Sequence, residues 1–177
     1  MGSPNLPIVA LMQPTLVSKP FHRPGWVYEE KYDGWRVVAY KNAERVRLVS
    51  RNGRDLTPRF RELAAAVGVL PARSLILDGE IAVFDTALIS RFEWLRGQPK
   101  DETATPPMLI AFDCLYARRK DLRERPLGVR RHVLEAEVDG HRLILPARRL
   151  ADDGLAAWEE VLERGYEGLV AKDLASP

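Results

Sequence analysis

The chain has 177 residues, of which 46% are apolar and 29% charged, and its formal net charge is +2. These values are typical of a soluble globular protein with one sizeable domain or two tightly packed lobes. No apolar run approaches the roughly 20 residues of a membrane span, no secretory signal is visible, and Cys114 has no partner for an internal disulfide. We therefore expect a cytoplasmic protein without membrane contacts.

The first 25 residues are predicted to form an extended N-terminal segment, because prolines recur between Pro4 and Pro24. Residues 26–40 then indicate two strands joined as a hairpin by a tight turn at Asp33-Gly34. If residues 26–32 are extended, Glu29 and Lys31 share one face. A lysine at a strand end beside a glycine turn is placed to meet a ligand, although a solvated Lys-Asp pair fits the same pattern.

Further elements follow at short intervals. Strands are predicted at 44–51, 74–85, 108–116, 142–150 and 168–174. Helices are predicted from a Thr57 cap to Gly68, at 89–96, at 127–138, and from Asp152 or Asp153 to Gly165 with Leu155, Trp158 and Leu162 inward. Residues 98–107 are expected to be a polar loop. The pattern predicts an α+β domain with largely antiparallel sheets flanked by helices.

One strand breaks its own apolar pattern. In residues 74–85, Leu75, Leu77, Ile81 and Val83 fall on one face, and Asp78 and Glu80 lie on the other. Two carboxylates on one face of an otherwise apolar strand are costly unless they meet a cation or a polar ligand. Such departures are expected at functional sites.

Five segments, in order, resemble the motifs of covalent nucleotidyltransferases. They are Lys31-Tyr32-Asp33-Gly34-Trp35-Arg36, Ser50-Arg51-Asn52-Gly53, Leu77-Asp78-Gly79-Glu80, Phe112-Asp113-Cys114-Leu115-Tyr116 and Glu167-Gly168-Leu169-Val170-Ala171-Lys172. The residues of these segments are most similar to those of ATP-dependent DNA ligases. Among these enzymes they most resemble the ligase domain of bacterial multifunctional end-joining ligases of the DNA ligase D type. The resemblance implies a nucleotidyltransferase (ATP-grasp-like) fold with an adenylation domain over residues 26–177.

The resemblance also implies a reaction, in which a lysine amine attacks the α-phosphate of ATP and holds AMP as a phosphoramidate. Lys31 would be the nucleophile, and it must be neutral to react, although a free lysine has a pKa near 10.4. Arg36, Lys172 or Mg²⁺ would supply the nearby cation that favours the neutral amine. Mg²⁺ or Mn²⁺ is the implied metal.

Roles for the other residues follow from the same resemblance. Glu29 would read the adenine edge, Phe112 would stack on the base, and Arg36 and Arg51 would hold ribose or phosphate. Glu80 would contact the ribose or bind metal, Glu167 would bind metal, and Lys172 would touch a phosphate. Strict alternation along the last strand, however, places Lys172 opposite Glu167. Read singly, Arg51 could cap a turn, Phe112 could be core, and Asp78 could pair with an arginine.

The family continues with a further lysine motif and an oligonucleotide-binding (OB-fold) barrel, which we do not find in this sequence. ATP is favoured over NAD as the cofactor because no NAD-recognition segment is seen. We expect weak nucleotide binding, slow or no self-adenylation, and no nick sealing by this stretch alone. The implied partners are nicked double-stranded DNA, an OB-fold domain, polymerase or nuclease domains of a longer chain, and an end-binding protein.

Two alternatives stay open at this point. An RNA ligase or an mRNA capping guanylyltransferase shares the Lys-x-Asp-Gly motif. A non-catalytic module could instead bind DNA or proteins through short arginine sets such as Arg118-Arg119 and Arg148-Arg149. The arginines are also compatible with ordinary solvated faces.

Overall fold

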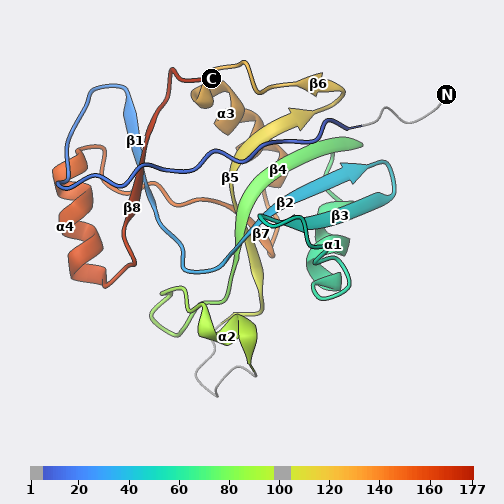
Figure 1. Ribbon diagram of the computed structural model, residues 1–177, viewed down its shortest axis with the longest axis horizontal. Coiled ribbons are helices and arrows are strands. Elements are labelled where there is room, and N and C mark those ends of the chain that lie inside the picture. The colour runs from blue at the N-terminus through green and yellow to red at the C-terminus, as the bar shows by residue number, and fades with distance from the viewer. Residues whose placement is uncertain (1–5, 98–104) are drawn as a thin grey trace.

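The computed structural model describes residues 6–97 and 105–177 and contains two β-sheets with helices packed against them (Figure 1). The strands are β1 (Trp26–Glu30), β2 (Trp35–Asn42), β3 (Arg45–Ser50), β4 (Ser74–Ala82), β5 (Met108–Ala117), β6 (Lys120–Asp121), β7 (Ile144–Pro146) and β8 (Leu169–Asp173). The helices are α1 (Arg61–Gly68), α2 (Glu93–Arg96), α3 (Leu127–Val138) and α4 (Gly154–Arg164). The predicted α+β class with largely antiparallel sheets is confirmed.

The larger sheet has six strands in the order β3-β2-β4-β5-β6, with β7 added parallel to β5 and all other pairs antiparallel. In its centre Arg36 of β2 lies opposite Glu80 of β4, and Val38 lies opposite Asp78. Directly opposed residues share a face. The two carboxylates noted in the sequence therefore lie on the same face as Arg36.

The main core lies on the other face of this sheet. Val37, Leu75 and Leu77 are fully buried there against α1 and α3, which contribute Val67 and Leu134. Burying a side chain of this kind stabilises a fold by about 1.5–3 kcal/mol. Arg36, Asp78 and Glu80 lie on the opposite face and are therefore directed away from the helices.

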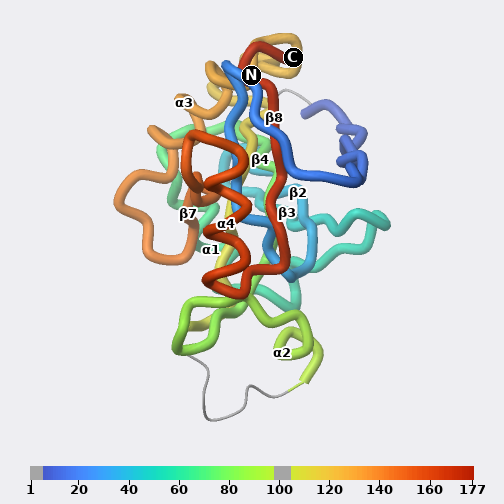
Figure 2. Tube along the Cα trace, turned by 90° about the vertical axis from the view of Figure 1, so that its left-hand side faces the viewer, coloured from blue at the N-terminus to red at the C-terminus, as the bar shows by residue number. Residues whose placement is uncertain are grey.

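The smaller sheet pairs β1 with β8 antiparallel and packs one face on α4, which lies beside both strands in Figures 1 and 2. Tyr28 is buried there against Ala157 and Val161. Asp153 caps α4 by accepting the backbone N–H groups of residues 155 and 156, and Gly165 ends the helix at φ 69°. Both caps were predicted from the sequence.

The N-terminal segment crosses in front of the larger sheet in Figure 1, on the face opposite the main core. Leu6, Val9 and Leu11 pack there with Val38 and Ile76. Residues 6–25 contain no helix or strand, as expected for the described part of this segment. The segment therefore shares a face with Arg36, Asp78 and Glu80.

The predicted hairpin of residues 26–40 is wrong, because β1 pairs with β8 while β2 pairs with β3 and β4. Asp33 is held elsewhere: its backbone N–H donates to Ser90 Oγ (2.8 Å), and its carboxylate accepts the N–H of Phe92 (3.2 Å). Gly34 is needed for close approach rather than for a turn, since a Cβ there would overlap the carbonyl oxygen of Ile81.

Several element boundaries also differ from the predictions. Thr57 does not cap α1, which begins at Arg61, because its hydroxyl accepts the N–H of Leu48 (2.9 Å). The helix predicted at 89–96 is confined to α2, the strand predicted at 142–150 is confined to β7, and that predicted at 74–85 ends at residue 82. Most of the loop predicted at 98–107 lies outside the described residues. Within the described ranges, no helix is both long and apolar enough to cross a membrane.

The predicted inward face of α4 is right at Trp158, which packs against the cluster around Tyr28, and wrong at its two leucines. Leu155 and Leu162 are 52% and 63% exposed, whereas Ala157 and Val161 are buried. Gly154 explains the choice, since a Cβ there would lie 2.5 Å from the Tyr28 ring. Tyr28 therefore selects the stripe of small residues rather than the leucines.

Candidate functional site

Lys31 lies immediately after β1, at the edge of the smaller sheet. Its backbone N–H donates to the carbonyl of Gly168 (3.0 Å), which fixes it beside the start of β8. Its Nζ forms an ion pair with Glu167, and the two side chains are 44% and 39% exposed. Glu167 therefore holds the amine at an accessible position.

Lys172 shares the face that Glu29 and Lys31 occupy, because it lies opposite Val27 in the pairing of β1 with β8. Its Nζ is 2.5 Å from Glu29 Oε2 and 4.6 Å from the centroid of the Phe112 ring. The predicted opposition between Lys172 and Glu167 does not apply, because β8 begins at Leu169. Glu167 lies outside the strand, so the alternation of side chains along β8 does not fix the face on which it lies.

Arg36 binds Asp78 through two hydrogen bonds, Nε–Oδ1 at 3.1 Å and Nη2–Oδ2 at 2.8 Å. Asp78 is thus an arginine partner, one of the readings left open by the sequence. The guanidinium carbon of Arg36 also lies 5.3 Å from the Phe112 centroid, so two cations contact this ring. Phe112 is partly exposed between them.

Glu80 completes the group on β4. Burial raises its pKa to about 8, and the nearby charges of Asp78 and Glu167 act in the same direction, while Arg36 and Lys31 oppose them. The electrostatic partners show that Glu80 lies within reach of both Lys31 and Glu167. Lys31, Glu80 and Glu167 therefore line one region, as the sequence predicted.

Arg51 lies at the margin of this group. Its backbone N–H donates to the carbonyl of Arg36 (3.3 Å), and its exposed side chain reaches Gln13 Oε1 at 3.5 Å. The neighbouring carbonyl of Met12 accepts a hydrogen bond from Arg36 Nη1 (2.7 Å). The N-terminal segment thus contacts both arginines, which the sequence did not reveal because its apolar residues show no regular period.

The model of the family described as ATP dependent DNA ligase domain matches residues 10–177. The chain belongs to this family. The five motif segments that carried the resemblance lie inside the matched range. Of their side chains, Arg36, Asp78, Glu80 and Phe112 lie on the sheet face opposite the main core. The family assignment and the geometry of these residues agree.

The chain is also similar in sequence to individual ligases of this family. The multifunctional non-homologous end joining protein LigD of Mycolicibacterium smegmatis is 32% identical over 147 residues, covering 83% of this chain and 19% of that protein. DNA ligase C1 of the same organism is 32% identical over 184 residues, covering 97% and 53%. The chain thus spans between 19% and 53% of the length of these two relatives.

The fold agrees with solved ligase domains. The ligase domain of M. tuberculosis LigD superposes with a TM-score of 0.73 at 29% identity, covering 88% of this chain and 51% of that one. A mycobacterial DNA ligase D solved as a complex with ATP and MES gives the same TM-score and identity. These matches confirm the fold predicted from the motifs.

A divalent cation fits the donor chemistry of Glu80 and Glu167. The described residues contain no cluster of three or more His, Cys, Asp or Glu side chains poised to hold a metal. Mg²⁺ commonly uses only one or two carboxylates and completes its shell with water and phosphate oxygens. Glu80, whose pKa is raised by burial beside other carboxylates, is a group whose charge a cation would compensate.

Arg131 of α3 belongs to the site and was missed by the sequence analysis. It is 1% exposed, and its Nη1 lies 3.2 Å from Glu29 Oε1 while its Nη2 donates to the carbonyl of Ala147 (3.1 Å). Glu29 is therefore buried between Arg131 and Lys172. The available signal was the position of Arg131 on the same helical stripe as Leu127 and Leu134.

Proposed function

We propose that this chain is the adenylation domain of an ATP-dependent DNA ligase and that Lys31 carries AMP. Family membership supports the reaction class, and the accessible amine of Lys31 between Glu167 and the Glu80 carboxylate supports the nucleophile. No other lysine of the described residues combines an exposed amine with both carboxylates.

In the proposed step, the neutral Nζ of Lys31 attacks the α-phosphorus of ATP. The N–P bond forms as the bond from the α-phosphorus to the bridging oxygen breaks, and pyrophosphate leaves with that electron pair. One proton leaves Nζ, to Glu167 or to water. Glu167 holds the amine at the site before the reaction, and its ion pair with Lys31 must open for the attack.

The remaining residues bind and orient the nucleotide in this proposal. The Phe112 ring stacks on the base, a contact worth about 1–3 kcal/mol in comparable aromatic–base pairs. Arg36 and Lys172, which both contact that ring, would exchange this contact for ribose and phosphate oxygens. When bound, Mg²⁺ or Mn²⁺ at Glu80 and Glu167 would neutralise phosphate charge.

Glu29 is held by Lys172 and Arg131, and its carboxylate would present a fixed acceptor for the amino group of adenine. Arg51 would reach ribose or phosphate from the margin of the site. The AMP would then pass to the 5′-phosphate of a nick in duplex DNA, and the 3′-hydroxyl would displace it. The relatives' names support further domains and an end-joining role for a longer chain.

Covalent labelling tests the proposal. We expect α-labelled ATP, and not α-labelled GTP, to leave label on the denatured chain in the presence of Mg²⁺. Lys31→Ala should abolish the label, while Lys120→Ala, at an exposed position on β6, should retain it. Labelling by GTP would favour a capping enzyme, and equal labelling of the Lys31 variant would refute the assignment.

A further inference from the structure

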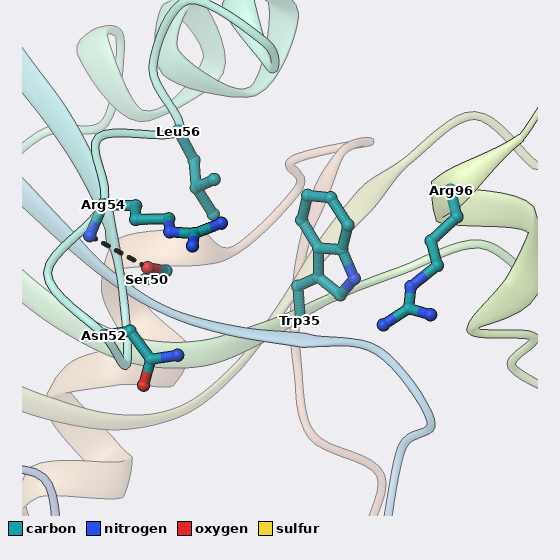
Figure 3. A pocket seen from close by; sticks show the side chains of 6 residues that line it. All are labelled: Trp35, Ser50, Asn52, Arg54, Leu56 and Arg96. Carbon is teal, nitrogen blue, oxygen red and sulfur yellow. Dashed lines mark hydrogen bonds between the residues drawn. The ribbon is translucent and has the colours of Figure 1, made fainter.

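A cavity of about 250 Å³ borders the chain beside Lys31. Tyr32, which follows Lys31 directly, and Arg148 both line it. The cavity shown in Figure 3 is similar in volume, about 260 Å³, but none of its lining residues adjoins Lys31 or Glu167 in the chain; they are Trp35, Ser50, Asn52, Arg54, Leu56 and Arg96. Arg148 is thus an arginine beside the nucleophile that has no role in the proposed reaction.

The backbone of Arg148 holds the chain on both sides of Lys31. Its carbonyl accepts the N–H of Glu30 (3.1 Å), and its N–H donates to the hydroxyl of Tyr32 (2.9 Å). Lys31 itself is bound on the other edge of β1, where its N–H donates to the carbonyl of Gly168 (3.0 Å). The backbone beside the amine is therefore held from both edges of the strand.

The side chain of Arg148 lies on the face of β1 opposite Lys31. Glu30 is directed to that face because successive side chains along a strand alternate, and Arg148 Nη1 lies 3.5 Å from its Oε2. The same Nη1 donates to the hydroxyl of Tyr166, whose ring packs in the buried cluster against α4. Arg148 therefore joins the residue before Lys31 to the residue before Glu167.

The contacts on this face are buried, whereas the pair of Lys31 with Glu167 is exposed. The Glu30 side chain is 1% exposed, and in the described part of the chain Arg148 is the one cation within 4.0 Å of its carboxylate. Over the same residues Oε2 lacks a hydrogen-bond partner, so loss of Arg148 would leave this buried charge uncompensated. An exposed ion pair, by contrast, shifts its own equilibrium by a factor of at most about five. The exposed pair therefore stands on a buried support.

We propose that Arg148 is a positioning residue that sets the distance between Lys31 and Glu167. Through Glu30 and Tyr166 its side chain ties the end of β1 to the segment before β8. It holds the amine beside the Glu167 carboxylate without touching substrate, and it thereby presents the amine for attack on ATP. This role rests on the proposed function of Lys31. Positioning of this kind matters because a displacement of about 1 Å can lower a reaction rate about 100-fold.

Trace acetylation with acetic anhydride, in the absence of ATP, tests the proposal. Mass spectrometry of the digested chain gives the acetylation rate of Lys31 relative to that of Lys120, an exposed lysine on β6. The ion pair with Glu167 shields the amine from a small acylating reagent. Arg148→Met should therefore raise the ratio about 2- to 5-fold, the range over which an exposed ion pair acts.

The matched control is Arg149→Met, because the Arg149 side chain is also exposed and pairs with Glu135, away from these contacts. This control should leave the ratio unchanged. Arg148→Lys keeps a cation beside the buried carboxylate and should recover most of the parent value. Glu167→Gln should raise the ratio directly, and Arg148→Met added to it should raise the ratio no further. A merely structural role would add its own effect.

Tyr166→Phe gives a milder test, since it keeps the ring in its cluster and removes only the hydroxyl that accepts from Arg148. It should raise the ratio in the same direction, and it decides the question if Arg148→Met unfolds. An unchanged ratio in Tyr166→Phe or in a folded Arg148→Met would overturn the proposal. So would an equal rise in Arg149→Met, or full additivity with Glu167→Gln.

A second readout follows the slow addition of AMP in the presence of Mg²⁺. Arg148→Met should lower the rate at saturating ATP about 10- to 100-fold, with little change in the ATP concentration that gives half the maximal rate. A general loss of structure would raise that concentration as well. AMP on the Lys31→Ala chain would refute the proposed function, whereas the acetylation ratio tests the role of Arg148 independently of ATP.

Discussion

Replacing Arg131 by Met should lower the free energy of unfolding far more than replacing its exposed neighbour Arg149 by Gln. Both arginines reach Glu135 Oε1, at 3.3 and 2.7 Å, but their side chains are 1% and 47% exposed. Arg131 also lies 3.2 Å from the buried carboxylate of Glu29, an attraction of about 5 kcal/mol at an effective dielectric constant near 20.

Removing one member of a buried pair leaves the other charge uncompensated, which typically costs about 3–5 kcal/mol. Lys172 continues to contact Glu29, so we expect Arg131→Met to fall at the lower end of this range. Arg149→Gln should cost about 0–1 kcal/mol, as surface pairs do. Urea denaturation of both variants gives the two free energies of unfolding directly.

A double-mutant cycle then isolates the interaction. Adding Glu29→Gln to Arg131→Met removes the orphaned charge and should recover at least about 1 kcal/mol. The reasoning is refuted if Arg131→Met is no more destabilising than Arg149→Gln, or if the second substitution adds its full cost. Either result would mean that Arg131 does not hold Glu29 in place.

Three further predictions follow from the same structure. Gly34→Ala should destabilise the fold by at least about 1–3 kcal/mol in urea denaturation because its Cβ would overlap the Ile81 carbonyl, whereas Gly97→Ala, with open space, should be nearly neutral; equal effects would contradict this. Burial raises the pKa of Glu30 to about 7, above its unfolded value of 4.5, so this group makes stability fall as pH rises through that window. Glu30→Gln should flatten that decline in melts between pH 5 and pH 8, scanned at about one-unit steps, and an unchanged slope would argue against it. Phe112→Leu should weaken ATP binding by about 1–3 kcal/mol in calorimetry with little change in melting temperature, and an unaltered affinity would exclude stacking.

Local features of this fold could be predicted from the sequence because they depend on near neighbours. The alternation in β4 separated Asp78 and Glu80 from the core, and the caps Asp153 and Gly165 fixed both ends of α4. These signals need only backbone geometry and one or two hydrogen bonds. They can therefore be predicted without knowledge of which elements pack together.

Features that depend on distant partners could not be predicted. Nothing in residues 26–40 indicates that β1 pairs with β8, because the pairing is decided between segments more than a hundred residues apart. The burial of Arg131 on α3 likewise depends on Glu29, which lies on β1 of the smaller sheet. In α4 the leucine stripe and the small-residue stripe are both plausible, and the ring of Tyr28 decides between them.

The candidate site was predicted as a set of residues but not as an arrangement. The motifs named Lys31, Glu80, Glu167, Phe112 and Lys172, and the structure brings all five into one region. The motifs did not reveal that the amine of Lys172 lies 4.6 Å from the centroid of the Phe112 ring. That contact is set by the start of β8 after Glu167, a boundary that alternation could not locate.

The most direct measurement is the mass of the peptides of this chain after prolonged incubation with ATP and Mg²⁺. We predict one added AMP on the peptide that contains Lys31, absent when Lys31 is replaced by Ala. AMP on another peptide, or equal addition of AMP to the Lys31→Ala chain, would contradict the assignment of the nucleophile.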